Sequence, residues 1–334
     1  MAYEQPETWW RRVGSSTRGF HYVRPDGAVR APAALRRIRA LRVPPGWTDV
    51  HIAPDPRREL QAWGRDRAGR KQYIYSAARV AKRDGRKWSS VLRVGRLLPT
   101  LRAATNAHLC RPELDREKVL ATVVRLMSRG FFRVGGERYA IQNRTFGICT
   151  LAKRHVRVEG PNLVFRYRGK RRKEQRQIVA DTPLARIVDE LLDLPGKRLF
   201  RYRNGNGTVS NLTARLVNTY LLAVLGGRCT SKDLRTFGGT VRAATILAEL
   251  GPPVSEREAK KHLSLCCRLV AQDLGNTPAI CRKAYIHPAV LGGYEHGRTI
   301  EAVMRKAPRP LEAREPPGFY PEEAALMRFL ERYG

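Results

Sequence analysis

The chain shows two different spacings of apolar residues, one after the other. In residues 49–53, 59–64 and 71–75, apolar and polar positions alternate in short runs, which is typical of half-buried strands. Beyond the dense charges of residues 81–87, apolar residues recur three or four positions apart, which is typical of amphipathic helices. The pattern therefore predicts an α+β protein, with a small β-rich part followed by a larger, mostly helical part.

The charged stretch marks the boundary between the two parts, where Gly85 interrupts it. We expect a partly ordered arm over residues 1–40, a small β-rich domain over residues 41–83, and a larger, mostly helical domain over residues 84–334. Strands over residues 163–168 and 177–179 are predicted to form a hairpin around the basic tip 169–173. The expected helices cover residues 112–130, 184–192, 213–225, 232–250, 256–273, 278–285 and 322–332.

The predicted helix over residues 232–250 combines a core face with a basic face. Its apolar stripe consists of Leu234, Phe237, Val241, Ala244 and Ala248. Thr230 or Ser231 can cap its first turn, and Asp233 suits the positive end of the helix dipole. Lys232 and Arg235 lie on one face, because residues three apart on a helix are neighbours. An anion such as phosphate would stabilise this pair; the alternative is an exposed basic face.

The charge of the chain is strongly one-sided. Of 334 residues, 64 are Lys or Arg and 30 are Asp or Glu, which gives a net charge of +34. This excess selects a polyanionic partner, and DNA, RNA and an anionic membrane all fit it. Apolar residues make up 42% of the chain, so a substantial core is expected. No apolar run approaches the roughly 20 residues of a membrane span, and the N-terminus does not resemble a signal peptide, so we expect a cytoplasmic protein.

Several other kinds of site find little support in the sequence. The six cysteines form neither C-x-x-C pairs nor a disulfide framework. Gly169-Lys170 and Gly196-Lys197 are each followed by Arg, so neither is a phosphate-binding P-loop, and no H-E-x-x-H motif occurs. These motifs therefore give little support for a metal site or a nucleotide cofactor of these kinds.

Two stretches of the sequence resemble a known family. Residues 231–238 read Ser-Lys-Asp-Leu-Arg-Thr-Phe-Gly, and residues 274–285 read Leu-Gly-Asn-Thr-Pro-Ala-Ile-Cys-Arg-Lys-Ala-Tyr. Both resemble type IB DNA topoisomerases of the small poxvirus-like bacterial kind, and the similarity runs from about Trp47 to the last helix. The resemblance implies a catalytic domain of the tyrosine recombinase/topoisomerase IB type. It also implies an isomerase that relaxes supercoiled duplex DNA through a 3′-phosphotyrosyl intermediate, swivelling and religation, without ATP or metal.

The resemblance assigns a role to each of six residues. Attack on a phosphodiester needs fixed cations, an in-line nucleophile and a proton for the leaving oxygen. Tyr285 would be the nucleophile, and Lys170 at the hairpin tip would be the general acid, assisted by Lys232. Arg133 and Arg235 would clamp the phosphate, because a guanidinium matches two oxygens at once. Asn276 would donate to a non-bridging oxygen, at a position where the viral relatives carry histidine.

Aromatic residues interleaved with basic ones predict contacts to DNA. Tyr73 and Tyr75 share one face of the strand over residues 71–75, with Gln72 on the other. The alternative is an aromatic face packed on the small domain's own core. The resemblance favours contacts to the major groove from Gln72, Tyr73 and Tyr75. Arg70, Lys71 and Tyr139 complete the expected contact set. The implied partner is double-stranded DNA, clamped by a monomer in the nucleoid.

Two other functions remain open at this point. A tyrosine recombinase or integrase uses the same covalent chemistry, but it carries His-x-x-Arg where this chain has Lys232-Asp233-Leu234-Arg235. It also has His or Trp at the position of Asn276, and a helical N-terminal domain in place of strands. A non-enzymatic DNA-compacting protein would need only the charge. In that case, removing the hydroxyl of Tyr285 would change nothing.

Overall fold

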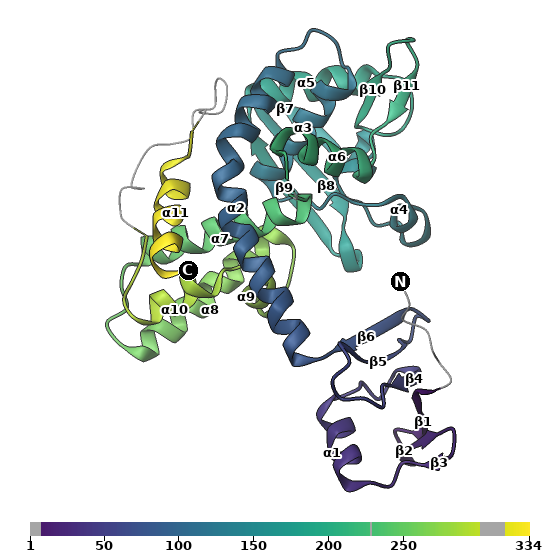
Figure 1. Cartoon of the computed structure of the whole chain (residues 1–334). Helices are drawn as coiled ribbons and strands as arrows, with labels where there is room; N and C mark the ends of the chain where they lie inside the picture. Colours follow the sequence, from purple (N-terminus) through teal and green to yellow (C-terminus); the bar gives the residue numbers. More distant parts are fainter. Residues whose placement is uncertain (1–7, 228, 301–317) are drawn as a thin grey trace. The chain divides into compact units, whose positions relative to one another are not determined.

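The computed structural model describes residues 8–227, 229–300 and 318–334 (Figure 1). The chain forms two compact units, Met1–Lys87 and Trp88–Gly334. The boundary between them lies inside a long helix, α2 (Ala77–Leu109), a few residues after the boundary expected from the sequence. Helical periodicity in α2 is weak because charged residues and Pro99 interrupt it, so the sequence pattern did not predict this helix.

The N-terminal unit is built on one antiparallel sheet. Its strands have the order β3-β2-β1-β4-β5-β6. The elements are β1 (Trp10–Ser15), β2 (Gly19–Arg24), β3 (Gly27–Ala28), α1 (Pro32–Ala40), β4 (Thr48–Ile52), β5 (Leu60–Arg65) and β6 (Lys71–Tyr75). The predicted strands over residues 49–53, 59–64 and 71–75 are confirmed as β4, β5 and β6. Val50, Ile52 and Ala62 from these strands form the small core.

The prediction of a separate arm over residues 1–40 is wrong for residues 8–40. Strand β1 pairs with β4, with Trp10 opposite Ile52, and so extends the sheet. Helix α1 inserts Ile38, which is 1% exposed, into the same core. The sequence obscured this because β1 and β2 are half-exposed strands rich in charge, and α1 buries only one residue fully.

The C-terminal unit is mostly helical, with a three-stranded antiparallel sheet in the order β7-β8-β9 and a small β10–β11 hairpin. Beyond α2, its helices are α3 (Arg116–Gly130), α4 (Glu137–Asn143), α5 (Thr182–Asp193), α6 (Ala214–Leu225), α7 (Ser231–Leu250), α8 (Glu256–Leu274), α9 (Pro278–Ala284), α10 (Pro288–Glu295) and α11 (Pro321–Tyr333). Its strands are β7 (Val156–Glu159), β8 (Asn162–Arg168), β9 (Glu174–Ala180), β10 (Arg201–Arg203) and β11 (Val209–Asn211). All seven predicted helices are present, and so is the predicted hairpin, as β8 and β9. Helices α4 and α10 are too short to show a periodicity, and the pattern did not predict them.

Helix α7 lies at the centre of this unit and packs against α3, α6, α8, α10 and α11. The predicted stripe is buried from Leu234 to Ala244, with Ala248 partly buried. Thr230 is the cap: its hydroxyl accepts from the amide of Asp233, and the Asp233 carboxylate accepts from the amide of Thr230. The start of α7, which carries Lys232 and Arg235, is therefore firmly placed.

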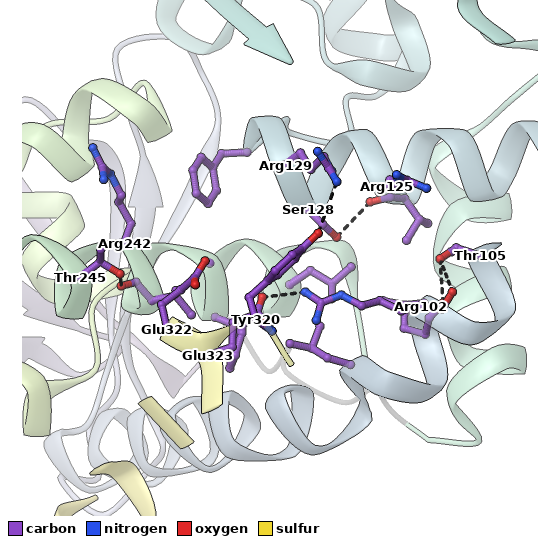
Figure 2. Close-up of a pocket in the computed structure, with 18 residues that line it drawn as sticks. Arg102, Thr105, Arg125, Ser128, Arg129, Arg242, Thr245, Tyr320, Glu322 and Glu323 are labelled. Atoms are coloured by element: carbon purple, nitrogen blue, oxygen red, sulfur yellow. Dashed lines mark hydrogen bonds and ion pairs between the residues drawn. The ribbon is translucent and has the colours of Figure 1, made fainter. Parts of the chain in front are cut away.

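A cavity of about 330 Å³ lies on the core side of α7, where α11 begins (Figure 2). Arg102 donates to the Glu323 carboxylate at 2.8 Å and to the carbonyl of Gly318. Arg129 donates to the Tyr320 hydroxyl and pairs with the buried Asp181. These ion pairs and hydrogen bonds hold the start of α11 against α2 and α3, which is a structural role. No helix in the described ranges is both long and apolar enough to cross a bilayer.

Candidate active site

The turn between α8 and α9 organises the candidate site. Helix α8 ends at Leu274, and Gly275 takes the left-handed conformation with φ +56°. A Cβ at Gly275 would also meet the end of the Gln175 side chain on β9, but that side chain can shift, so the left-handed backbone is the main reason that glycine is favoured there. Carbonyls at a helix C-terminus carry partial negative charge and lack helical partners. They are therefore suited to hold cationic side chains.

Both predicted clamp arginines bind this turn. Arg133 donates to the carbonyl of Gly275 at 3.0 Å and to the Asn276 amide oxygen at 2.7 Å. Arg235 donates to the carbonyl of Leu274. The two guanidinium groups, 102 positions apart in sequence (235 minus 133), are thus held on successive carbonyls of one turn.

The backbone around Arg133 is fixed by close packing. Phe132 is fully buried, with its ring 4.8 Å from that of Phe165. The carbonyl of Arg133 accepts from the amide of Ile148 at 2.8 Å. Gly135 and Gly147 pack backbone against backbone, and a Cβ on Gly147 would lie 2.5 Å from the Cα of Gly135. This packing fixes where the Arg133 side chain leaves the core.

Arg235 is buried, with 5% of its surface exposed. Burial and the nearby charge of Arg133 lower the pKa of Arg235 to about 10, while the neighbouring Tyr285 raises it. At neutral pH the guanidinium is therefore still charged, and it has no carboxylate partner within the described chain. An anion beside it would relieve this electrostatic cost.

Tyr285 lies directly after α9 as its C-terminal cap, and its ring centre is 5.6 Å from the Arg235 guanidinium carbon. The predicted helix over residues 278–285 ends one residue earlier than expected, at Ala284. The Thr240 hydroxyl on α7 lies 3.3 Å from the carbonyl of Tyr285 and accepts from the amide of His287. The backbone of Tyr285 is therefore held from both α7 and α9.

Two donors at this site have no partner. Arg235 Nε and Asn276 Nδ2 are buried atoms without a hydrogen-bond acceptor in the described chain. Each unsatisfied buried donor costs about 1–3 kcal/mol, so natural structures rarely retain one without a reason. A phosphate oxygen would satisfy both of them beside the Tyr285 ring.

Lys170 and Lys232 are not brought into this cluster. Lys170 lies in the exposed turn Lys170–Arg172 between β8 and β9, and its amine contacts none of the other candidate residues in the described structure. Lys232 is exposed in the first turn of α7, where its amine likewise makes no such contact. The structure therefore unites Arg133, Arg235 and Asn276 with Tyr285, and leaves both lysines free to approach a substrate.

Two residues of the site were not predicted from the sequence. Tyr167 on β8 is buried, and burial raises the pKa of Tyr167, while Gln177 and the charges of Arg235 and Arg133 lower it. This phenol thus lies close to both arginines. In the sequence, Leu163, Phe165 and Tyr167 occupy alternate positions of β8. That alternation could have predicted that Tyr167 points into the core. Thr240 gave no sequence signal, because its role depends on a contact with a distant backbone.

Cys281 borders the site but is not a competing nucleophile. It is fully buried on α9, four residues before Tyr285. Burial raises the pKa of the Cys281 thiol to about 11, although the charge of Arg235 opposes this shift. The thiol therefore stays protonated at neutral pH, and a protonated thiol is a weak nucleophile.

The expected DNA-contact residues of the N-terminal unit lie on and beside β6. Tyr73 is 47% exposed and stacks on Tyr75, with ring centres 6.2 Å apart. Gln72 donates to the Asp66 carboxylate, which also pairs with Arg70. The Lys71 amine lies over the Trp63 ring at 4.0 Å. Tyr73 is therefore an exposed aromatic beside cations, whereas Tyr75 is partly buried and packs against the apolar cluster of Trp9, Ala53 and Leu60.

Tyr139 belongs to the other unit, on the short helix α4. It is 60% exposed, and its neighbour Ile141 is 75% exposed. Large apolar side chains exposed on a polar helix indicate a contact surface. No cluster of three or more His, Cys, Asp or Glu suited to hold a metal ion occurs among the described residues.

Comparison with known proteins identifies the family. The model of the family described as the catalytic core of eukaryotic DNA topoisomerase I matches residues 71–308. This chain belongs to the type IB DNA topoisomerases. It is therefore a topoisomerase, an isomerase that acts on DNA. A second family model, for the N-terminal domain of bacterial DNA topoisomerase IB, matches residues 19–66. This match begins before residue 40, in agreement with the single sheet of the N-terminal unit.

Curated relatives of this topoisomerase come from large DNA viruses. DNA topoisomerase 1B of Acanthamoeba polyphaga mimivirus is 28% identical over 269 residues, which cover 78% of this chain and 80% of the relative. DNA topoisomerase 1B of vaccinia virus (strain Copenhagen) is 25% identical over 285 residues, covering 81% of this chain and 85% of the relative. The similarity thus extends over most of both chains.

Proposed function

We propose that this topoisomerase relaxes supercoiled duplex DNA by transient cleavage of one strand, with Tyr285 as the nucleophile. The phenolic oxygen attacks a backbone phosphorus and forms a 3′-phosphotyrosyl bond, and the 5′-oxygen leaves. The duplex swivels, and the 5′-hydroxyl then attacks the same phosphorus and releases Tyr285. Each step exchanges one phosphodiester for another, so the cycle needs neither ATP nor metal.

The observation that supports this proposal most strongly is the pair of unsatisfied donors beside Tyr285. Arg235 Nε and Asn276 Nδ2 are buried without an acceptor among the described residues, next to a guanidinium cluster that no described carboxylate neutralises. In this proposal the scissile phosphate accepts hydrogen bonds from both donors and lies beside the two guanidinium groups. Arg133 and Arg235 stabilise the charge that grows on its oxygens, and such fixed donors typically contribute about 10²–10³-fold to a rate.

The proton balance of cleavage requires two further events. Tyr285 loses its phenolic proton to solvent water as it attacks, and the departing 5′-oxygen gains a proton. We assign the second transfer to Lys170, with Lys232 assisting. The exposure of the Lys170–Arg172 turn is compatible with a lysine that meets the leaving oxygen only when DNA is bound.

We further propose that both units bind the duplex. Gln72, Tyr73 and Tyr75 contact the major groove, with Arg70 and Lys71 on neighbouring phosphates. Tyr139 contributes from α4. We expect a monomer that closes around DNA in the nucleoid.

The test mixes the protein with negatively supercoiled plasmid in EDTA without ATP, and adds detergent to trap covalent adducts. We expect relaxed topoisomers and a protein–DNA adduct.

Tyr285→Phe deletes only the nucleophilic oxygen, so it should abolish both products while duplex binding stays within about twofold, because the ring and its packing remain. Adducts that persist in Tyr285→Phe would place the nucleophile elsewhere. A recombinase would instead join strands from two duplexes, and a DNA-compacting protein would form no adduct.

A further inference from the structure

A small basic pocket shares none of its lining residues with the Tyr285 cluster. It has a volume of about 300 Å³ and lies between the C-terminal end of α4 and the β8–β9 hairpin, two elements that the hydrogen bond from the Phe146 amide to the Arg168 carbonyl also connects. The residues that line it are Gln142, Asn143, Arg144, Arg168 and Arg172. Three guanidinium groups therefore share one pocket with two amides.

None of these three arginines forms an ion pair with a described carboxylate. Glu174 is opposite Arg168 across the β8–β9 ladder, but the two side chains do not come within ion-pair distance. Like charges gathered around one space repel each other unless an anion lies between them. Guanidinium and amide donors together match the oxygens of a phosphodiester.

The backbone of the pocket indicates that these arginines are retained for a purpose. Arg144 has φ +50° and Arg172 has φ +59°, which is the left-handed region that side chains with a Cβ rarely occupy. Arg144 is also the C-terminal cap of α4, a position where glycine is usual. Residues held in such conformations cluster at ligand-binding sites.

The pocket is connected to the predicted general acid. Arg172 and Lys170 belong to the same three-residue turn, which the hydrogen bond from the Gly169 amide to the Lys173 carbonyl closes at 2.8 Å. An anion bound by Arg172 would therefore restrict the turn that carries Lys170. Because the Lys170 amine has no partner of its own in the described chain, such a restriction would help to place it.

We propose that this pocket binds one backbone phosphate of the DNA, distinct from the scissile phosphate, and so holds Lys170 at the leaving oxygen. The inference rests on the proposed function. It adds a second phosphate site and a reason for the Lys170 amine to be positioned only on correctly docked DNA.

The first test uses duplex cleavage substrates that each carry one neutral methylphosphonate at a different position. Binding and single-turnover adduct formation are measured for the unaltered protein, Arg144→Gln and Arg172→Gln. We expect one position at which the methylphosphonate weakens binding by about tenfold, as for loss of one charge-assisted hydrogen bond. At that position neither variant should lose anything further, because both arginines bind the same phosphate.

Arg171→Gln is the matched control. Arg171 is in the same turn with φ +62° and is exposed, but it does not line the pocket. Any loss of binding caused by Arg171→Gln should therefore be the same on the methylphosphonate duplex as on the unmodified duplex. If no single phosphate is coupled to both Arg144 and Arg172, the proposal is wrong. If inorganic phosphate stabilises the unaltered protein against heat but neither variant, and no DNA phosphate is coupled, the pocket serves a free anion and the proposal is also wrong.

A second measurement tests the connection to Lys170. At saturating protein, Arg172→Gln should cleave an ordinary duplex about tenfold more slowly. This loss is smaller than the loss expected on removing the general acid itself, because Lys170 is still present but less well positioned. A substrate with sulfur at the 5′-bridging position has a leaving group that needs little protonation, so the deficit should disappear there. An equal deficit on both substrates would contradict the link. Absence of any adduct with the unaltered protein would instead refute the proposed function itself.

Discussion

The Thr240 side chain contacts the backbone on both sides of the turn that carries the proposed nucleophile, Tyr285. Its oxygen lies 2.9 Å from the carbonyl of Thr236 and 3.3 Å from that of Tyr285, and it accepts from the amide of His287 at 3.2 Å. Next to it, a Cβ on Gly239 would lie 2.9 Å from the carbonyl of Tyr285. Helix α7 therefore contacts the backbone of Tyr285 directly, and any displacement of this contact moves the phenol.

We predict that Thr240→Val slows both cleavage and religation by about tenfold. Valine keeps the shape but leaves the amide of His287 without an acceptor, which costs about 1–3 kcal/mol. Thr240→Ser keeps the hydroxyl and should restore most of the rate, and DNA affinity should not change. Thr245→Val is the control, because among the described residues Thr245 bonds only the carbonyl of Val241 on the same helix. Single-turnover rates measure these effects. An unchanged rate in Thr240→Val would show that packing alone holds Tyr285.

At Arg235 the prediction concerns geometry as well as charge. Arg235→Ala should slow cleavage by about 100-fold or more, on the scale of a lost oxyanion contact. Arg235→Lys should recover only part of this, because an ammonium cannot hold the Leu274 carbonyl and also present the second donor that Nε now presents. Full activity in Arg235→Lys would exclude a bidentate role.

Asn276→Ala should have a smaller effect than either change at Arg235. It removes one neutral donor, Nδ2, and the acceptor of Arg133 at 2.7 Å, while Arg133 keeps the carbonyl of Gly275. We expect cleavage to slow by about tenfold, near the net value of one hydrogen bond to a charged group. Asn276→Asp is the informative companion, since its carboxylate would neutralise Arg133 and repel the phosphate. Single-turnover cleavage faster in Asn276→Asp than in Asn276→Ala would contradict phosphate binding here.

At the level of elements, strong local signals were predicted correctly. Helix α7 has an apolar stripe, a Thr230–Asp233 capping box and a length of several turns, so pattern and chemistry agree. Helices α5 and α8 begin with Asp181 and Ser255 as caps, which makes their starts readable as well. Periodicity over many residues, reinforced by a cap, is therefore enough to predict an element.

Elements and contacts that depend on distant partners were not predictable. Strand β1 is half exposed and gains its place only by pairing with β4, far along the chain. The end of α8 before Gly275 was predicted, but the carbonyls of this turn bind Arg133 and Arg235 only because the segment after α3 and the start of α7 converge there. Family resemblance named the candidate residues. The pattern alone gave no distances, and the unsatisfied donors are visible only in the structure.

The β8–β9 hairpin carries the prediction for the general acid. If Lys170 protonates the departing 5′-oxygen, Lys170→Ala should lose about 10²–10⁴-fold on an ordinary phosphodiester. A 5′-bridging sulfur leaves without that proton, so Lys170→Ala should cleave the sulfur substrate almost as fast as the unaltered protein. Lys173→Ala is the neighbouring control on the same hairpin. If the sulfur substrate rescues Lys173→Ala but not Lys170→Ala, the proton donor is Lys173 and the assignment to Lys170 is wrong.

At the scale of the whole molecule, the net charge of +34 makes the salt dependence of DNA binding the quantity that tests whether both units contribute phosphate contacts. Each phosphate neutralised on duplex DNA adds about 0.9 to the negative slope of log K against log salt. Residues 77–334 keep α2 whole and contain the larger compact unit almost alone. We predict that the full chain has a slope steeper by about 3 or more than this fragment, as expected for several phosphate contacts from the sheet unit.

Both proteins should carry Tyr285→Phe, so that covalent capture does not distort the equilibrium. As a control, Tyr73→Ala in the full chain should weaken binding without changing the slope, because it removes an uncharged contact. Equal slopes for the full chain and the fragment would mean that the N-terminal unit makes no phosphate contacts, and that its exposed Tyr73–Tyr75 face has another partner.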